Sequence, residues 1–341
     1  MNIGESIFKA FYEVVRRNNL LNHLAHKVMQ SEWVHHFPVY RWIYKSWINN
    51  KVTRVIEKPT YLEITLTDAC NARCVMCPPE VHLGTTIMSH NLFEKLVREA
   101  REIGIEKMIL TGGEPLLDKR LVEKIKFAKG HGFSYIHMFT NGALMTERRA
   151  FEIISSGLDS LTWSIDSPRK EEYERIRVGL DFDNVISNIS KFIDIRKKMN
   201  SDYPLTRVNM VALPENRTSR IEFRKVFKGK VDIVEIMDSH NWAGIKDELT
   251  SGPGKEYFQL TRYPCHLLFT KVVVTPLGII KKCSIDFSEH GVIGDLKKQT
   301  LKAILHDKRL MSIKRAHLNY DFSEPGCDIC THKESWWVKP F

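Results

Sequence analysis

Residues 61–77 read YLEITLTDACNARCVMC and join an expected strand directly to a group of cysteines. The opening part, YLEITLT, is typical of a strand. Cys70, Cys74 and Cys77 follow with the spacing C-x3-C-x2-C and no histidine among them. Structural zinc sites usually take four protein ligands in C-x2-C pairs, whereas an iron-sulfur cubane held by three cysteines leaves one iron free. The stretch therefore predicts a metal centre whose fourth position these cysteines do not fill.

Strand-like and helix-like segments alternate from this strand onward. A helix over 90–104 is expected to begin after Ser89 as N-cap and to end at Gly104. The other expected segments are strands at 106–112, 133–141, 158–166, 205–213 and 231–238, and helices at 146–157, 169–177, 182–199 and 219–227. Six β/α units in succession predict an α/β fold, a partial (β/α)6 TIM-like barrel with a parallel sheet. Chemistry in such folds lies on loops at the carboxyl ends of the strands, where the cysteines fall.

The alternation stops after about residue 245, and a smaller α+β unit follows. Three features are expected there: a break at GPG (252–254), two strands within 267–285 joined by a turn at TPLG (275–278), and a helical stretch at 297–317. The unit carries the remaining cysteines: Cys265, Cys283, Cys327 and Cys330. The chain therefore divides into a helical N-terminal extension (1–58), a partial barrel (59–245) and a C-terminal domain (246–341).

The composition is that of an ordinary soluble globular protein of 341 residues, 43% hydrophobic and 27% charged. No run of about 20 apolar residues is present to span a membrane, and the N-terminus lacks a signal-peptide pattern, so we expect a cytoplasmic protein. In a reducing compartment, clustered cysteines indicate metal ligation sooner than disulfides. The net charge of +10 suggests an anionic partner, cofactor or surface. Nucleic acid is a disfavoured partner, because the sequence has no dense Lys/Arg run and no recognised nucleic-acid-binding motif.

The cysteine motif on the loop after the first strand resembles the signature of the radical SAM superfamily. In that family, three cysteines hold a 4Fe-4S cluster, and S-adenosylmethionine chelates the remaining iron through its amino and carboxylate groups. The resemblance implies that Cys70, Cys74 and Cys77 ligate this cluster. It also implies reductive cleavage of S-adenosylmethionine to a 5′-deoxyadenosyl radical, which abstracts a hydrogen atom from an unactivated carbon.

Further positions between about 61 and 240 match the family's S-adenosylmethionine site. TGGEP at 111–115 resembles the motif that binds the cofactor's amino group, although such a sequence also suits a strand-to-helix turn. The resemblance implies the following contacts: Gly112, Gly113 and Glu114 at the amino group, Thr140 and Asn141 near the cofactor, Ser164 and Asp166 at the ribose, Arg177 at the carboxylate, and Met76 beside the adenine. Arg175 is a less favoured substitute for Arg177.

The last four cysteines resemble the SPASM/Twitch extension of the same superfamily. Gly278 precedes Cys283 in a G-x4-C form, and Cys327 and Cys330 form a terminal C-x2-C. The resemblance implies that these three cysteines and Cys265 ligate one auxiliary 4Fe-4S cluster. Zinc is an alternative, since four thiolates suit both metals. The shorter Twitch type fits better than a full SPASM domain, because cysteines for a second auxiliary cluster are absent.

If all seven cysteines are ligands, no thiol remains to return a hydrogen atom to a substrate radical, as related epimerases require. A fully ligated auxiliary cluster is instead suited to accept an electron. We therefore expect an oxidoreductase that acts on a hydroxylated sugar- or cyclitol-like small molecule or glycan, with an external electron donor such as flavodoxin or ferredoxin. The alternative is a peptide maturase that crosslinks or epimerises a ribosomal precursor. A non-catalytic iron-sulfur or zinc protein is disfavoured, because Glu114 would then have no purpose.

Residues 235–244, EIMDSHNWAG, should face the open mouth of the barrel. Asp238 and His240 are candidate catalytic residues, because either can accept the proton lost when an alcohol is oxidised. Asn241 and Trp242 are candidates to hold a polar substrate. Equally, Asp238 and Asn241 suit a turn, and Trp242 suits a packing contact between the two units.

The two ends of the chain allow weaker predictions. Residues 1–58 carry an excess of basic over acidic side chains, with apolar residues at helical spacing. This pattern fits a cap on the open barrel, a peptide-docking surface, or an interfacial helix that makes peripheral contact with an anionic membrane or lipid-linked glycan. Near the other end, Trp336 and Trp337 are expected to shield the auxiliary cluster.

Overall fold

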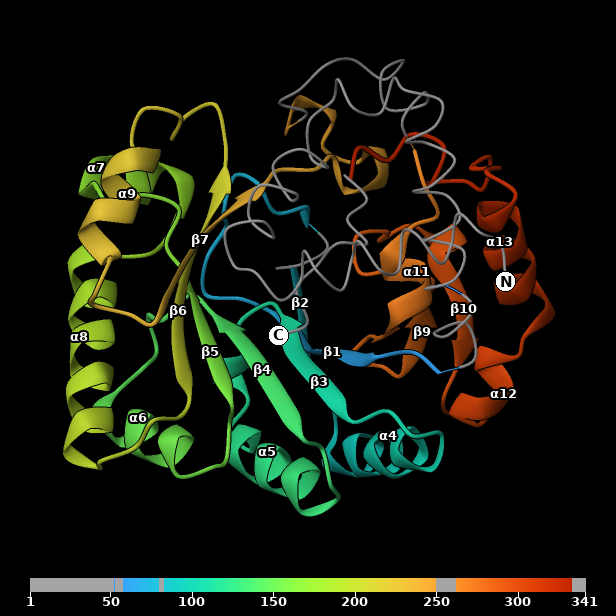
Figure 1. The fold of residues 1–341 in the computed structure, drawn as a ribbon, viewed down its shortest axis with the longest axis horizontal. Helices are drawn as coiled ribbons and strands as arrows, with labels where there is room; N and C mark the ends of the chain where they lie inside the picture. Colours follow the sequence, from blue (N-terminus) through green and yellow to red (C-terminus); the bar gives the residue numbers. More distant parts are fainter. Residues whose placement is uncertain (1–51, 53–57, 80–82, 250–261, 333–341) are drawn as a thin grey trace, which may run out of the picture.

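The computed structural model describes residues 52, 58–79, 83–249 and 262–332. At its centre, parallel strands lie side by side in chain order: β1 (Tyr61–Ala69), β3 (Lys107–Gly112), β4 (Tyr135–Thr140), β5 (Ser160–Ser164), β6 (Leu205–Ala212) and β7 (Ile233–Asp238). The strand order has two ends, so the curved sheet in Figure 1 is an open barrel. The predicted α/β fold with a partial barrel is confirmed.

Helices cover the outer side of these strands (Figure 1): α4 (His90–Glu102), α5 (Leu121–Gly130), α6 (Glu147–Ile154), α7 (Lys170–Ile176), α8 (Phe182–Lys198) and α9 (Arg220–Phe227). As predicted, Ser89 caps α4 by accepting a hydrogen bond from the Leu92 amide, and the chain turns at Gly104 with φ +81°. The sequence reasoning missed α5 and the short strand β2 (Leu83–Ile87), which pairs with β1. In α5 the buried face includes Lys124, paired with Asp118, and this interrupts the apolar pattern.

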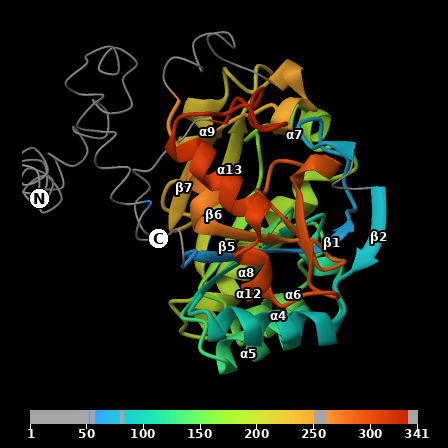
Figure 2. The same cartoon turned by 90° about the vertical axis from the view of Figure 1, so that its right-hand side faces the viewer.

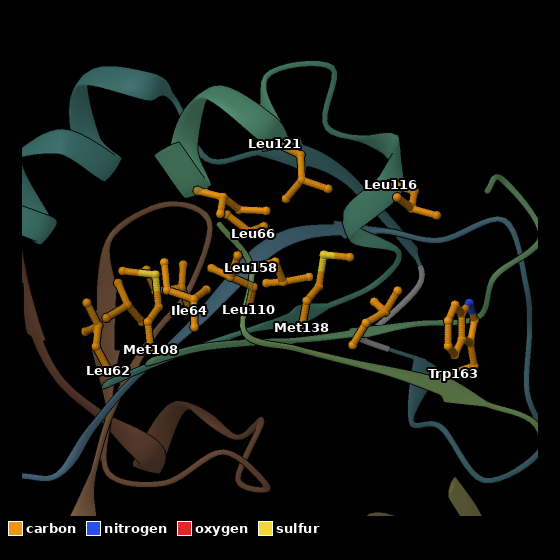
Figure 3. Packing of buried hydrophobic residues seen from close by; sticks show 14 of the residues in the cluster. Leu62, Ile64, Leu66, Met108, Leu110, Leu116, Leu121, Met138, Leu158 and Trp163 are labelled. Atoms are coloured by element: carbon orange, nitrogen blue, oxygen red, sulfur yellow. The ribbon is translucent and has the colours of Figure 1, made fainter. Parts of the chain in front are cut away.

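Alternate residues of the strands face opposite sides of the sheet, and the two sides differ in chemistry. On the outer side, Leu62, Ile64 and Leu66 of β1 are fully buried and pack with Leu121 of α5 in the cluster that Figure 3 shows. Burying each such side chain contributes about 1.5–3 kcal/mol to the free energy of folding. Glu63, from the opposite face of β1, lines a cavity inside the barrel. The outer face thus holds the helices, and the inner face is left for a site.

The C-terminal unit extends the same sheet. Its elements are α11 (His266–Thr270), β8 (Lys271–Val274), β9 (Ile279–Lys281), β10 (Val292–Asp295), α12 (Leu301–Leu305) and α13 (Lys308–Leu318). β8 pairs in parallel with β1, and β9 and β10 follow antiparallel, which gives the order β10-β9-β8-β1-β3-β4-β5-β6-β7. From the side in Figure 2, α12 and α13 stand in front of the barrel strands. The two cysteine-bearing parts of the chain therefore share one sheet.

The predicted hairpin and helical stretch are confirmed with two changes. The segment before β8 forms α11, because a short apolar run does not by itself distinguish a strand from a buried helix. The helical stretch divides at Asp307, whose carboxylate caps α13 by accepting a hydrogen bond from the Arg309 amide at 2.8 Å. Short 3-10 turns also occupy Pro115–Leu117, Trp242–Gly244, Asp247–Leu249 and Glu289–Gly291.

Some predictions fall outside the described residues: nearly all of the N-terminal extension (1–58), the GPG break (252–254), and Trp336 with Trp337. The domain boundaries at 58 and 245 stay predictions. Within the described ranges, no helix combines the length and apolar composition needed to span a bilayer.

Candidate active site

A cavity of about 1360 Å³ occupies the inside of the open barrel. Three of the cysteines that line it come from the loop after β1: Cys70, Cys74 and Cys77. A fourth, Cys283, comes from the C-terminal unit, just after β9. Cys283, more than 200 residues after Cys77 in the sequence, therefore faces the same space as the three cysteines of the loop.

The loop with the C-x3-C-x2-C motif is held by backbone hydrogen bonds. The amides of Arg73 and Val75 donate to the carbonyls of Val178 and Ile176 at 2.8 and 3.0 Å. Cys70, Cys74 and Cys77 are free thiols and lie near one another. A hydrogen bond from Cys77, together with the Arg177 guanidinium and against the effect of burial, lowers the pKa of Cys74 to about 7.

Two donors point at these sulfur atoms. Nη1 of Arg177 lies 3.6 Å from Sγ of Cys74, and Nδ2 of Asn141 lies 4.0 Å from Sγ of Cys70. A guanidinium and an amide N–H both favour the thiolate form, which is the form that ligates metal. These two donors therefore favour thiolates at Cys74 and Cys70, although burial raises the pKa of Cys70 and the hydrogen bond with Cys74 raises the pKa of Cys77.

Gly112 and Gly113 fit tightly against the end of β1. The amides of Gly113 and Glu114 donate to the carbonyls of Thr67 and Ala69 at 2.7 and 2.8 Å. A Cβ at Gly113 would lie 1.9 Å from the Ala69 carbonyl oxygen, and one at Gly112, with φ +116°, would lie 2.5 Å from that of Thr67. Only glycine allows this approach. Both glycines line the cavity.

Glu114 is almost fully buried and braces two neighbouring loops. Its carboxylate accepts hydrogen bonds from the Leu116 amide at 3.0 Å, the Thr140 hydroxyl at 2.7 Å and the Asn141 amide at 2.7 Å. Burial raises the pKa of Glu114, and these hydrogen bonds oppose the rise. Thr140 and Asn141 line the cavity, whereas Glu114 stands behind them. Glu114 therefore ties the loop after β3 to the loop after β4.

Asp166 holds Arg177 in place. Oδ2 of Asp166 accepts from Nε and Nη2 of Arg177 at 2.6 and 2.5 Å, and Oδ1 accepts from the Val211 amide at 2.6 Å. Burial alone would lower the pKa of Arg177, but the Asp166 carboxylate raises it. Asp166 is fully buried with φ +52°, while Arg177 and Ser164 reach the cavity. Arg175 is exposed, which favours Arg177 over it as a cofactor ligand.

The predicted substrate residues at the end of β7 and just after it take three different positions. Asp238 is exposed and does not line the cavity. His240 and Trp242 do line it, and Nε1 of Trp242 donates to the carbonyl of Met76 at 2.7 Å. Met76 is buried inside the cysteine loop. Nδ1 of His240 accepts a hydrogen bond from the Trp242 amide at 3.3 Å, and burial lowers the pKa of His240 to about 4.

Asn241 is fully buried and binds the backbone on both sides of Cys330. Its Nδ2 donates to the Ile329 carbonyl at 2.8 Å and to Oδ1 of Asp247 at 2.9 Å. Its backbone and side chain also exchange two hydrogen bonds with Thr331, each 3.0 Å long. Every polar group of the Asn241 side chain thus forms a hydrogen bond within the protein. The role of Asn241 is structural: it holds the segment that carries Cys330.

The four later cysteines come from segments that meet beside the cavity. Cys283 is near enough to Cys327 to affect its pKa, and burial raises the pKa of Cys327 to about 12. The Cys330 amide donates to the Cys327 carbonyl at 3.4 Å. His266, next to Cys265, has its ring 5.6 Å from that of His332, which lies two residues after Cys330. The cavity wall includes Cys283 but not the other three.

Buried charges support this second cysteine group. The Lys282 ammonium, beside Cys283, contacts Oδ2 of Asp286 at 2.9 Å and Oε1 of Glu324 at 3.4 Å, and it also binds the Pro325 carbonyl. These contacts attach the turn after β9 to the segment that leads to Cys327. These long-range contacts hold the segments of Cys283 and Cys327 close together.

The sequence reasoning missed a set of polar residues deeper in the cavity, on the inner faces of the strands: Glu63, His137, Arg207, Asn209, Glu235 and Lys271. The missed signal is their alternation with apolar residues. Strands of a parallel sheet that are covered on both faces are nearly continuous apolar runs. A charged or polar residue at every second position, as in Arg207 and Asn209 of β6, indicates an inner face that contacts something polar.

The chain's donors fit the cofactors that the cysteine motifs imply. The three motif sulfurs lie near one another, with an arginine and an amide directed at them. In the described residues, no three His, Cys, Asp or Glu side chains converge on a single point as ligands of one ion would. A 4Fe-4S cluster does not need such convergence, because its thiolates surround a larger group of iron and sulfide atoms. The wide cavity beside the loop leaves room for a further ligand.

Two protein-family models match the chain: the Radical SAM superfamily over residues 64–227, and the SPASM iron-sulfur cluster-binding domain over residues 265–331. The chain belongs to the radical SAM superfamily and carries a C-terminal SPASM domain. The Radical SAM domain implies a 4Fe-4S cluster with S-adenosylmethionine, and the SPASM domain implies an auxiliary iron-sulfur cluster.

The curated relatives include GTP 3′,8-cyclases. That of Thermodesulfovibrio yellowstonii is 32% identical over 179 residues, which cover 50% of this chain and 53% of that protein. That of Clostridium perfringens is 28% identical over 294 residues, which cover 73% of this chain and 90% of that protein. The match to the first of these spans about half of that protein's length.

Solved structures share the fold at low sequence identity. Streptococcus suis SuiB bound to its precursor peptide SuiA has a TM-score of 0.64 at 15% identity, over 81% of this chain and 71% of that one. BtrN in complex with AdoMet and 2-DOIA has a TM-score of 0.55 at 18% identity, over 80% of this chain and 93% of that one. These similarities establish the fold. The substrate has to be inferred from the residues of the site.

Proposed function

We propose that this protein is a radical SAM oxidoreductase that oxidises an alcohol of a hydroxylated sugar- or cyclitol-like small molecule. One observation carries the proposal: Cys283 of the C-terminal unit lines the same cavity as Cys70, Cys74 and Cys77. A substrate in that cavity lies between the place where hydrogen abstraction begins and the place where an electron can leave.

The proposed roles follow the geometry. Cys70, Cys74 and Cys77 hold the cluster that binds S-adenosylmethionine, and Cys265, Cys283, Cys327 and Cys330 hold the auxiliary cluster. The cofactor contacts are assigned to residues that line the cavity: Met76, Gly112, Gly113, Thr140, Asn141, Ser164 and Arg177. Glu114 and Asp166 act from behind this wall as positioning residues. When bound, these groups would supply one-electron chemistry: reductive cleavage of S-adenosylmethionine with abstraction of a hydrogen atom from the substrate, and an acceptor, the auxiliary cluster, for the second electron of the oxidation.

His240 is assigned to hold the oxygen that is oxidised. With its pKa at about 4, the ring is neutral near pH 7. Because Nδ1 accepts the Trp242 amide proton, the ring proton lies on Nε2, which can donate to a substrate oxygen. To accept the alcohol proton at Nδ1, the ring would have to release Trp242, so we assign that proton to water. Asp238 lies outside the cavity wall and is the weaker candidate.

Two other reactions begin with the same hydrogen abstraction. Cyclisation of GTP is favoured by the names of the curated relatives, one of which aligns over 90% of its own length. The support for maturation of a peptide is limited to the fold, which this chain shares with SuiB. An external reductant such as flavodoxin or ferredoxin serves all three reactions, so the products have to separate them.

The test uses anaerobically reconstituted protein with reductant, S-adenosylmethionine, and cyclitols, methyl glycosides, GTP or peptide. We expect 5′-deoxyadenosine together with a ketone product from a polyol. Cys74→Ala should abolish cleavage of S-adenosylmethionine, whereas Cys283→Ala should retain some cleavage and lose the ketone. Full turnover by Cys283→Ala would refute the electron-acceptor role. A cyclised nucleotide or a modified peptide in place of the ketone would refute the oxidation proposal.

A further inference from the structure

The residues that line the cavity away from the cysteine loop include six polar side chains, which we call the polar floor: Glu63, His137, Arg207, Asn209, Glu235 and Lys271. They come from the inner faces of β1, β4, β6, β7 and β8. Most lie in the amino-terminal halves of their strands, away from the loop that carries Cys70. None belongs to the cofactor site described above.

Two ion pairs form the sides of the polar floor. Nζ of Lys271 lies 2.5 Å from Oε2 of Glu63, and Nη2 of Arg207 lies 2.5 Å from Oε1 of Glu235. Glu63 and Arg207 are nearly buried, at 6% and 5% exposure. Removing such charges from water costs several kcal/mol per ion, and apolar residues of similar size often stabilise a fold as well or better. Stability is therefore a poor reason for placing these charges inside the barrel.

His137 contributes a neutral ring between the two pairs. Burial, with Arg207 and Lys271 nearby, lowers the pKa of His137 to about 3. Its Nε2 lies 3.2 Å from the Thr162 hydroxyl, and its Nδ1 lies 3.5 Å from the Tyr135 hydroxyl. The ring is thus held in place by neutral hydrogen-bonding groups and adds no charge of its own.

Asn209 connects the polar floor to the cofactor end of the cavity. In the strand register it is level with Ser164 on one side and Glu235 on the other. Its Nδ2 donates to Sδ of Met237 at 3.5 Å, while its buried Oδ1 accepts no hydrogen bond from the described residues. Asn209 is 5% exposed, and buried polar atoms nearly always have a partner. The open acceptor points to a donor supplied by a ligand.

We infer that the polar floor binds a hydroxyl-rich group of the substrate, with the Asn209 carbonyl oxygen accepting a hydrogen bond from one hydroxyl. This inference rests on the proposed oxidation of a polyol and adds the residues that select it. The polar floor has no net charge, because its two carboxylates match its two cations and its imidazole and amide are neutral. It offers both hydrogen-bond donors and acceptors. A hydroxyl group, which both donates and accepts, matches such a set.

The same balance disfavours an anionic ligand. Lys271 and Arg207 already have carboxylate partners, so a phosphate would approach Glu63 and Glu235 as well as the cations. Lys107, which lies over the Tyr61 ring at 5.5 Å, and Arg224 also line the cavity and add two cations to this balanced set. Two excess positive charges remain fewer than the negative charges of a triphosphate. The arrangement therefore separates a polyol from GTP.

The geometry also sets the orientation of the ligand. Ser164, level with Asn209, is the last residue of β5 and one of the proposed cofactor contacts. Arg207 lies two residues deeper on β6, about 7 Å further along the strand. A ligand held at both positions has one end at the cofactor and the other between the ion pairs.

The experiment measures equilibrium binding without reductant, so that it does not depend on turnover. Reconstituted holoprotein with S-adenosylmethionine is examined by saturation-transfer NMR with myo-inositol, methyl β-D-glucoside, GTP and a serine-containing hexapeptide. We expect a signal from at least one polyol. Asn209→Leu and Glu235→Gln should weaken that binding about tenfold, as expected for the loss of one good hydrogen bond. Asn184→Leu, on the exposed face of α8, should leave it unchanged.

Asn209→Ser provides a second variant in case leucine disturbs the fold, and thermal unfolding checks both proteins. The inference is overturned if no polyol binds, if polyol binding survives in the folded Asn209 variants, or if only GTP or the peptide gives a signal that depends on Asn209. Loss of binding in these variants together with a product other than a ketone would leave the polar floor standing and refute the oxidation proposal instead.

Discussion

The Trp242 indole donates a 2.7 Å hydrogen bond to the carbonyl of Met76, inside the loop that carries Cys74 and Cys77. The residue before it, Asn241, binds the backbone on both sides of Cys330. Two adjacent residues thus contact both cysteine-bearing segments. Trp242 also adopts φ +51°, a conformation that bulky residues rarely take without support from their surroundings. We conclude that this pair fixes the two segments relative to each other.

Trp242→Phe keeps an aromatic ring and removes the donor to Met76. We expect the protein to fold and to cleave S-adenosylmethionine, but to form about fivefold less product for each cofactor cleaved, since one lost hydrogen bond is worth about 1 kcal/mol. The measurement is the ratio of product to 5′-deoxyadenosine. Trp163→Phe is the control, because the Trp163 indole has no hydrogen-bond partner among the described residues. An unchanged ratio in Trp242→Phe would contradict the role of the contact.

Gly113→Ala tests the close approach of two loops at the cofactor site. Because the added Cβ would lie 1.9 Å from the Ala69 carbonyl oxygen, the backbone has to move. We expect a loss of about 1–3 kcal/mol in the free energy of unfolding and weaker binding of S-adenosylmethionine. Gly130→Ala, where nothing lies within 4 Å of the added atom, should be neutral or stabilising. Denaturant titration and a binding isotherm compare the two variants, and similar results for both would contradict the steric explanation.

Asp166→Asn removes a charge and keeps a residue type that tolerates φ +52°. Arg177 would lose its carboxylate partner and its fixed position beside Cys74. We expect the Kd for S-adenosylmethionine to rise about ten- to a hundredfold, the equivalent of a charge-assisted hydrogen bond worth about 1.5–3 kcal/mol. Asp183→Asn, at an exposed ion pair with Lys170, is the control. An unaltered Kd in Asp166→Asn would show that Arg177 does not depend on this carboxylate.

His137→Gln tests the neutral ring of the polar floor through the pH dependence of stability. The folded-state pKa of His137, about 3, lies below the ordinary histidine pKa of 6.5, so the unfolded chain binds a proton that the folded protein does not. The contribution of His137 to the free energy of unfolding is therefore fully present above pH 6.5. It falls as the pH drops toward 3, at about 1.4 kcal/mol per pH unit. His137→Gln should lose about 1.4 kcal/mol less than wild type between neutral pH and about pH 5.5.

Denaturant titrations at the two pH values measure this difference. Because His240 and the clusters are present in both proteins, their own acid sensitivity cancels in the comparison. His131→Gln, at an exposed surface position, should behave as wild type. A pH dependence in His137→Gln equal to that of wild type would mean that His137 is not held neutral by its surroundings.

The barrel could be predicted from the sequence because each of its elements has a local signature. The Ser89 cap and the turn at Gly104 bound α4 through contacts within a few residues. The cysteine spacing and TGGEP likewise lie within single loops, so the sequence predicted a candidate cofactor site there. The pairing of β8 with β1 could not be predicted in this way, because it joins segments about 200 residues apart.

The roles of individual side chains depended on contacts that no local pattern shows. The sequence left the role of Asn241 open between substrate binding and a turn. Its partners Ile329 and Thr331 lie about 90 residues later in the chain, so no local pattern could indicate them. Glu114 and Asp166 were predicted to touch the cofactor, a prediction that still awaits a test, yet they stand behind residues that line the cavity. The polar floor was missed because its residues come from five strands and form a group only when the sheet curves.

The pairing of β8 with β1 has a consequence for dissecting the protein. β1 has β3 on one side, and its other edge is shared by β8 along Tyr61–Ile64 and by β2 near Thr67. A chain truncated before β8 would bare the backbone donors and acceptors of a largely apolar strand, and such edges promote aggregation. The radical SAM half is therefore a poor candidate for expression by itself, and the two halves should melt as one cooperative unit.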